Sequence, residues 1–126
     1  NFLSPEYLSK VFFRLHYEDF TWGTQTIIDK HFPKIKKSIW NKSFQDEALN
    51  SRLCVFGYIS TTCYETIALN IPTIIFCEEQ YNFTEESKKE FDQLKKVGIV
   101  YDTPQQAADW IKKNYDKAHA CEFGRF

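Results

Sequence analysis

Three hydroxyl side chains and one carboxylate are grouped after a short apolar run. Ser60, Thr61 and Thr62 follow Gly57 closely, and Glu65 comes three residues after Thr62. At the start of a helix, such hydroxyls join free backbone N–H groups and the positive end of the helix dipole, which together bind phosphate well. Glu65 could accept hydrogen bonds from ribose hydroxyls. The spacing Thr62-x-x-Glu65 is also that of a capping box, which needs no ligand, and spacing alone leaves both interpretations open.

A second group lies at the end of the apolar run 11–16. Arg14 and His16 belong to this run, and the acids Glu18 and Asp19 follow it. A guanidinium can hold a phosphate through two hydrogen bonds. A histidine can serve as a general base or as a donor to phosphate. The alternative for this group is a surface cluster of ion pairs.

The segment Cys77–Tyr81 is the third candidate. Its paired acids, Glu78 and Glu79, could contact a sugar or a base, or could be solvated loop residues. The sequence contains no G-x-G-x-x-G, no G-x-x-x-x-G-K-[ST] and no H-E-x-x-H. A classical dinucleotide site, a P-loop and a zinc-protease site are therefore not predicted.

Composition narrows the class of protein. The 126 residues are 43% hydrophobic and 17% aromatic, which suits one domain with one core. Because 16 basic residues balance 17 acidic ones, no nucleic-acid partner is expected. No apolar run reaches the roughly 18 residues of a membrane span. The four cysteines have no metal spacing, and we expect reduced core thiols and a cytoplasmic location.

Short apolar runs alternate with amphipathic stretches along the chain. Strands are predicted at Val11–His16, Lys37–Trp40, Leu53–Phe56, Thr73–Phe76 and Ile99–Tyr101. Helices are predicted at Thr21–His31, Ser43–Leu49, Ser60–Leu69, from Thr84 to the C′ residue Gly98, and from Thr103 to Asn114. The tail, residues 115–126, carries little signal. This alternation predicts a single α/β domain over residues 1–126, with a Rossmann-like three-layer α/β/α arrangement and a mainly parallel sheet.

In such a sheet, ligands bind beyond the carboxyl ends of the strands. The hydroxyl group at residues 60–62, the Arg14 group and the Cys77–Tyr81 segment each follow a predicted strand. All three are therefore candidates for one ligand-binding edge.

The segment Gly57–Phe76 resembles the donor-binding segment of GT-B glycosyltransferases. That segment reads as a strand, a Ser/Thr-rich turn, a helix carrying Glu, and then A-L-x-x-P-x-I. More narrowly, it is similar to a family of transferases from bacterial surface-polysaccharide gene clusters. Three further segments agree with that family, in order within residues 11–112: Arg14–Trp22, Phe91–Ile99 and Asp102–Ala108. Asn70 stands where the GT-B pattern often has Gly, and Asn also tolerates the left-handed conformation of a helix C′ residue.

The resemblance implies a role for each candidate. Ser60, Thr61 and Thr62 would hold the pyrophosphate of a nucleotide-sugar, and Glu65 its ribose. Arg14 and His16 would act in catalysis, by neutralising the leaving phosphate. No cofactor or bound metal is implied, and the reaction would be transfer of a sugar in polysaccharide biosynthesis.

A GT-B enzyme has two Rossmann-like domains with the active site between them. The chain, which begins at Asn1, resembles the C-terminal one. We therefore expect a further N-terminal Rossmann-like domain as its partner, and an isolated chain without turnover. The resemblance also allows the full enzyme to associate peripherally with the inner face of the membrane.

Other functions stay open on the sequence alone. A CDP-alcohol phosphotransferase of teichoic-acid type has the same architecture. A non-catalytic α/β binding module could keep the fold and lose the reaction. A receiver-like signalling domain fits less well, because the first strand ends in Arg14 and His16 instead of acids.

Overall fold

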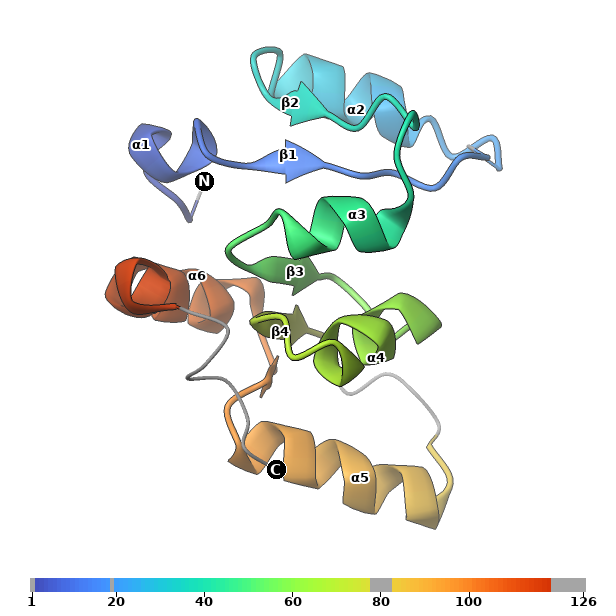
Figure 1. Ribbon diagram of the computed structural model, residues 1–126, viewed down its shortest axis with the longest axis vertical. Coiled ribbons are helices and arrows are strands. Elements are labelled where there is room, and N and C mark those ends of the chain that lie inside the picture. The colour runs from blue at the N-terminus through green and yellow to red at the C-terminus, as the bar shows by residue number, and fades with distance from the viewer. Residues whose placement is uncertain (1, 19, 78–82, 119–126) are drawn as a thin grey trace. The chain divides into compact units, whose positions relative to one another are not determined.

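The computed structural model describes residues 2–18, 20–77 and 83–118. It divides into two compact units, Leu3–Ser43 and a second that begins at Phe44. Each unit has its own small parallel sheet with helices, which confirms the predicted α/β class with parallel strands and is consistent with a Rossmann-like fold (Figure 1). A single domain over residues 1–126 stays a prediction. No helix among the described residues is both long and apolar enough to cross a membrane.

The first unit pairs two short strands. Its elements are α1 (Pro5–Leu8), β1 (Phe12–Phe13), α2 (Thr24–His31) and β2 (Lys36–Lys37). The two strands run parallel, and the N–H of Ser38 extends the ladder by donating to the carbonyl of Phe13 at 2.8 Å. The crossover between the strands is α2, which buries Ile28.

In the first unit, the strand predicted over Val11–His16 is observed only at Phe12–Phe13. Two further boundaries differ from prediction because of left-handed backbone. Phe20, Thr21 and Gly23 have φ of 49°, 63° and 63°, and an α-helix cannot run through such residues. The helix predicted from Thr21 therefore begins only at Thr24. Trp40 has φ of 58°, so the strand predicted over Lys37–Trp40 ends at Lys37.

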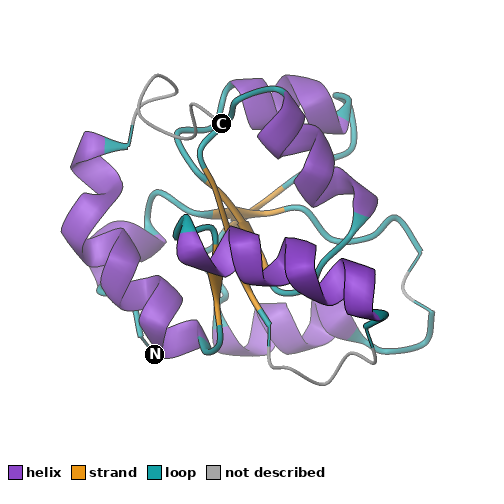
Figure 2. Ribbon diagram, turned by 90° about the horizontal axis from the view of Figure 1, so that it is seen from below, coloured by secondary structure: helices purple, strands orange, loops and turns teal. Residues whose placement is uncertain are grey.

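The second unit contains the larger sheet. Its elements are α3 (Phe44–Leu49), β3 (Cys54–Phe56), α4 (Thr61–Ala68), β4 (Thr73–Phe76), α5 (Glu85–Lys96), β5 (Val100–Tyr101), α6 (Pro104–Asn114) and the 3-10 turn η1 (Tyr115–Lys117). The strands lie in the order β3-β4-β5 and are parallel, and the helices that connect them are longer than the strands (Figure 2). Of the predicted tail 115–126, residues 119–126 lie outside the described residues.

Helix ends in the second unit follow the sequence signals. The Thr84 and Thr103 hydroxyls cap α5 and α6 by accepting from the N–H groups of Ser87 and Gln106. Gly98, with φ of 77°, ends α5 in a Schellman motif, in which the N–H of Ile99 donates to the carbonyl of Leu94. The predictions of these caps are confirmed.

The helix α4 ends in the same motif without a glycine. Asn70 adopts φ of 55°, and its N–H and that of Ile71 donate to the carbonyls of Ile67 and Thr66. Asn70 therefore replaces the usual Gly with the same backbone geometry, as predicted. The turn delivers the chain directly into β4.

The core of the second unit surrounds β4. Its buried members are Cys63, Ile75, Cys77, Phe91, Ile99 and Val100. Under α4, the buried Thr73 hydroxyl donates to the Thr66 hydroxyl at 2.8 Å, and Thr66 in turn donates to the carbonyl of Cys63. Since both hydroxyls are hydrogen-bonded, burial of these polar groups carries little penalty. The central strand β4 and the helix α4 are thus fixed to each other.

Cys54 gives the second unit a pH dependence that can be measured. Burial raises the pKa of its thiol from 9.0 to about 11. Below pH 9 the thiol is protonated in both folded and unfolded chains, so it has no effect. Between pH 9 and 11 only the unfolded chain loses the proton, and stability falls by about 2 kcal/mol. Urea unfolding of the chain and of Cys54→Ala across this range should show a steeper loss in the unsubstituted chain; equal slopes would contradict the prediction.

Candidate functional site

The predicted phosphate-binding residues lie at the N-terminus of α4. Ser60 is the N-cap residue in extended backbone, and Thr61 and Thr62 form the first turn. The Ser60 and Thr62 hydroxyl oxygens are hydrogen-bonded to each other at 2.7 Å, while Thr61 is exposed. The first N–H groups of an α-helix have no partner within the helix. This helix end therefore combines three hydroxyl groups with backbone N–H donors, an arrangement that favours binding of an anion.

Cys63 stabilises the N-cap of α4 through two contacts with Ser60. Its sulfur lies 2.8 Å from the carbonyl oxygen of Ser60 and 3.4 Å from the Ser60 nitrogen, and it accepts from that N–H. The side chain is fully buried, and burial raises the pKa of the thiol. The protonated thiol can thus donate to the carbonyl. Cys63 is a structural part of the turn and not a reactive nucleophile.

Glu65 is not part of a capping box. The capping-box interpretation of Thr62-x-x-Glu65 is wrong, because the N-cap is Ser60 and Thr62 already lies inside the helix. The box spacing is instead that of Ser60 and Cys63. The Glu65 carboxylate, one turn into the helix, accepts a hydrogen bond from the side-chain amide of Gln45 at 2.7 Å.

The contact between Gln45 and Glu65 was not predicted from the sequence. Gln45 lies in the first turn of α3, and α3 and α4 contact each other. Nothing in the local pattern around residue 45 marks it, because only the packing of the two helices brings its amide to Glu65. The amide restricts the carboxylate to one position beside the helix.

Arg14 is held on the face of an indole. Its guanidinium carbon lies 4.0 Å from the centre of the Trp40 ring. One terminal nitrogen donates to the hydroxyl of Ser38 at 3.1 Å, and both lie 3.4 Å from the carbonyl oxygen of Lys42. Stacking and hydrogen bonds together fix the plane of the guanidinium. The sequence did not predict that Trp40 and Ser38 contact Arg14. Trp40 has left-handed backbone and Ser38 follows a strand, and neither position has a sequence signature.

His16 is exposed, and its ring nitrogen Nδ1 lies beside the backbone of Glu18. The Glu18 nitrogen is 3.1 Å from Nδ1 and the Glu18 carbonyl oxygen is 3.2 Å from it. Nδ1 accepts from the N–H in one tautomer and donates to the carbonyl in the other. In the first tautomer Nε2 carries the proton and can donate to a phosphate, and in the second Nε2 can act as a base.

The predicted site residues divide between the two units. Arg14 and His16 belong to the first, and the α4 group with Glu65 belongs to the second. Within each unit the structure brings the members of the group together. In the third candidate segment, Cys77 is buried in the core, and residues 78–81 lie outside the described residues.

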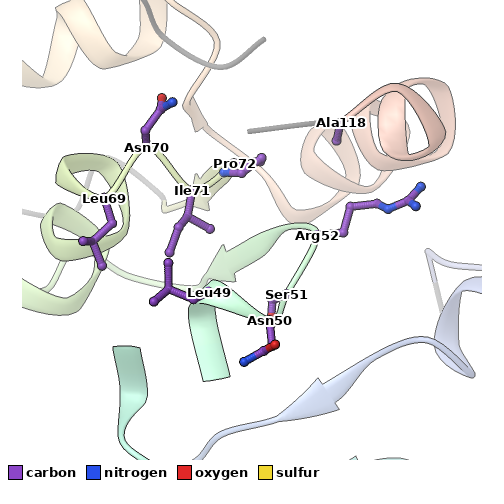
Figure 3. A pocket seen from close by; sticks show the side chains of 9 residues that line it. All are labelled: Leu49, Asn50, Ser51, Arg52, Leu69, Asn70, Ile71, Pro72 and Ala118. Carbon is purple, nitrogen blue, oxygen red and sulfur yellow. The ribbon is translucent and has the colours of Figure 1, made fainter. Parts of the chain in front are cut away.

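A shallow hollow of about 360 Å³ lies elsewhere in the second unit (Figure 3). It is lined by Leu49, Asn50, Ser51, Arg52, Leu69, Asn70, Ile71, Pro72 and Ala118. Arg52 precedes β3 and Pro72 precedes β4, so the hollow is at the amino ends of the strands. Ligands of parallel sheets bind at the other edge. We therefore assign the hollow no catalytic role.

No metal centre is evident in residues 2–18, 20–77 and 83–118. Among them, no three His, Cys, Asp or Glu side chains are grouped so that they could hold an ion. The α4 end would instead bind an anion through hydroxyl and N–H donors.

Comparison with known proteins gave one match. A family model described as "LIC12162 family transferase" matches residues 1–120. Neither the curated proteins nor the solved structures contain a match. The matched range includes residues of both units and all six predicted site residues.

Proposed function

Because the chain belongs to the LIC12162 family of transferases, we propose that it binds the nucleotide-sugar donor of a glycosyltransferase. The reaction would transfer the sugar to an acceptor in the assembly of surface polysaccharide. The observation that carries the proposal is the N-terminus of α4, where hydroxyls and helix N–H groups converge after the carboxyl end of β3.

The pyrophosphate would bind at the start of α4. Thr61 is exposed and can donate directly to a phosphate oxygen, and the Ser60–Thr62 hydroxyl pair can direct one proton outward. Donors that are already in place stabilise negative charge without rearrangement.

Glu65 would bind the ribose. Its carboxylate is not consumed by a helix cap and is oriented by Gln45. Glu65 lies one turn beyond the phosphate-binding end of the helix. A nucleotide whose phosphates bind at that end could therefore place its ribose near the carboxylate. A carboxylate accepts two hydrogen bonds from vicinal hydroxyls, which selects a ribonucleotide.

Arg14 and His16 would stabilise the departing nucleotide diphosphate. The guanidinium is pre-organised by Trp40 and Ser38, and His16 would donate from Nε2 in the tautomer whose Nδ1 accepts from the N–H of Glu18. Negative charge develops on the leaving oxygen in the transition state, so fixed donors lower the barrier. Further acceptor contacts and the general base would come from a partner Rossmann-like domain. The isolated chain would therefore bind donor weakly and would not turn over.

The test is a calorimetric and NMR titration of the chain with UDP, CDP, GDP and CMP. One nucleotide should bind saturably, and Glu65→Gln and Thr61→Val should each weaken it by about tenfold or more. Glu90→Gln, which changes an exposed carboxylate on α5, is the matched control and should have no effect. If CDP-glycerol binds more tightly than CDP, the donor is a CDP-alcohol instead of a sugar nucleotide.

Binding that is unchanged in Glu65→Gln and Thr61→Val would refute the placement of the donor at α4. Absence of binding at millimolar nucleotide, both in the chain and in the full-length protein, would refute donor binding altogether. Gln45→Ala tests whether the Gln45 amide positions Glu65 for the ribose: it should weaken binding of the ribonucleotide while leaving the affinity for pyrophosphate unchanged.

A further inference from the structure

Aromatic rings form a continuous series on the first unit. Trp22 lies against Phe20 with ring centres 5.5 Å apart, and Phe20 lies 4.9 Å from His16. His16 stacks on Tyr17 at 4.5 Å, and Tyr17 meets the edge of Trp40 at 6.3 Å. We call these five residues the aromatic series. Its Trp40 end carries the Arg14 guanidinium.

The series is turned toward solvent. Trp22 is 73% exposed and Tyr17 is 71% exposed, whereas large aromatic side chains are usually buried for most of their surface. Phe20 and Trp40 are also exposed by more than two fifths. Contiguous exposed apolar surface on a folded unit indicates a binding site.

The backbone holds the rings in this position at a cost. Phe20 and Trp40 both adopt left-handed φ, of 49° and 58°, which is unfavourable for bulky residues by about 1 kcal/mol or more each. Strain of this kind persists where the surroundings enforce it, and it concentrates at ligand-binding sites. Phe20 and Trp40 lie in two separate loops, and each ring is exposed although its backbone conformation is unfavourable.

We propose that the aromatic series is a stacking platform for the sugar rings of a carbohydrate acceptor. The proposal rests on the proposed function, because it places the acceptor sugar beside Arg14 and His16. One face of a pyranose ring bears C–H groups that are apolar and slightly positive, and its hydroxyls extend from the rim. Such a ring lies well on the negative face of an indole or phenol.

The polar edges of the series favour a sugar over an apolar partner. Tyr17 has a phenol hydroxyl, the two indoles have N–H donors, and the Nε2 of His16 donates or accepts according to its tautomer. Only Phe20 lacks a polar edge. Faces for C–H contacts with donors at their margins match a ligand that is apolar on its face and hydroxylated at its rim. A lipid tail would leave those donors unsatisfied.

The experiment uses ¹H–¹⁵N spectra of the 126-residue chain, in which each tryptophan contributes one indole signal. The probes are hexasaccharides of glucose, of N-acetylglucosamine and of galacturonic acid, added at millimolar concentration. At least one should shift the Trp22 and Trp40 signals saturably and leave that of Trp110, on α6 of the second unit, in place. Tyr17→Ala and Trp22→Ala should each weaken binding about tenfold, whereas Trp22→Phe should retain most of it.

Tyr64→Ala removes another exposed ring, from α4, and should not alter hexasaccharide binding. The proposal is overturned if none of the three probes shifts the Trp22 signal, or if Tyr17→Ala and Trp22→Ala bind as the unsubstituted chain does. It is also overturned if the Trp22 signal responds only to anionic phospholipid vesicles or to chain concentration. Nucleotide titration with Glu65→Gln reports on the donor site separately, so failure of the platform and failure of the donor site are distinguishable.

Discussion

Replacing Phe91 by alanine is expected to lower the free energy of unfolding of the second unit by about 3–5 kcal/mol. Phe91 is the buried residue of α5 and is 4% exposed. It packs on Phe83 with ring centres 5.0 Å apart and belongs to the core cluster with Ile75 and Val100. Alanine would remove the buried ring through which α5 contacts the sheet and would leave a cavity, with Leu94 as the remaining apolar contact.

This loss is large beside the total stability of a small domain, about 5–15 kcal/mol. Urea unfolding followed by circular dichroism measures it directly. Lys89→Ala, an exposed substitution on the same helix, controls for helix propensity and should change stability by less than about 0.5 kcal/mol. A loss below about 1 kcal/mol in Phe91→Ala would mean that α5 is not anchored as the structure has it.

The second large effect is expected for Arg14→Lys. In the full-length transferase, this change should lower kcat by about 10²-fold or more with little change in KM. Lysine keeps the charge but loses the planar fork and the stacking on Trp40. The hydrogen bonds to Ser38 and Lys42 would also lose their geometry. The effect falls on kcat because the charge on the leaving phosphate is fully developed only in the transition state.

Arg52 supplies a matched control for this substitution. Its guanidinium also lies over an aromatic ring, that of Tyr115 at 5.3 Å, but at the amino end of β3. Arg52→Lys should leave kcat unchanged. If both substitutions have the same effect, or if Arg14→Lys raises only KM, then Arg14 does not stabilise the transition state.

The second unit could be predicted well because its signals are local. Thr84 and Thr103 cap their helices, Gly98 ends α5, and the apolar run Thr73–Phe76 is the strand β4 to the residue. Caps and buried parallel strands depend on neighbouring residues, so one sequence suffices to find them.

The first unit was predicted less well because its backbone departs from what its residues prefer. Thr21 and Trp40 favour extended or helical conformations, yet both are left-handed. No sequence rule places a bulky residue there, so both the start of α2 and the end of β2 were misplaced. The helix α1 was also missed, since four residues from Pro5 to Leu8 carry too short a pattern.

For the candidate site, the sequence identified residue types but not their contacts. It placed hydroxyls at the start of α4, and it could not decide whether Glu65 was part of a cap or a ligand. The structure removes the cap interpretation because Ser60 occupies the N-cap position. Gln45 and Trp40 position Glu65 and Arg14 from other segments, and such contacts become visible only in three dimensions.

The left-handed backbone at Phe20 and Trp40 bears on how this protein can be engineered and how it can diverge. Glycine adopts such φ without strain, so a screen for thermostability alone should enrich Gly or Asn at both positions. Each gain would remove a ring from the aromatic series. Substitutions at these two positions that raise thermal stability would then weaken ligand binding. A stabilised variant that kept both rings would need its stabilising substitutions elsewhere in the chain.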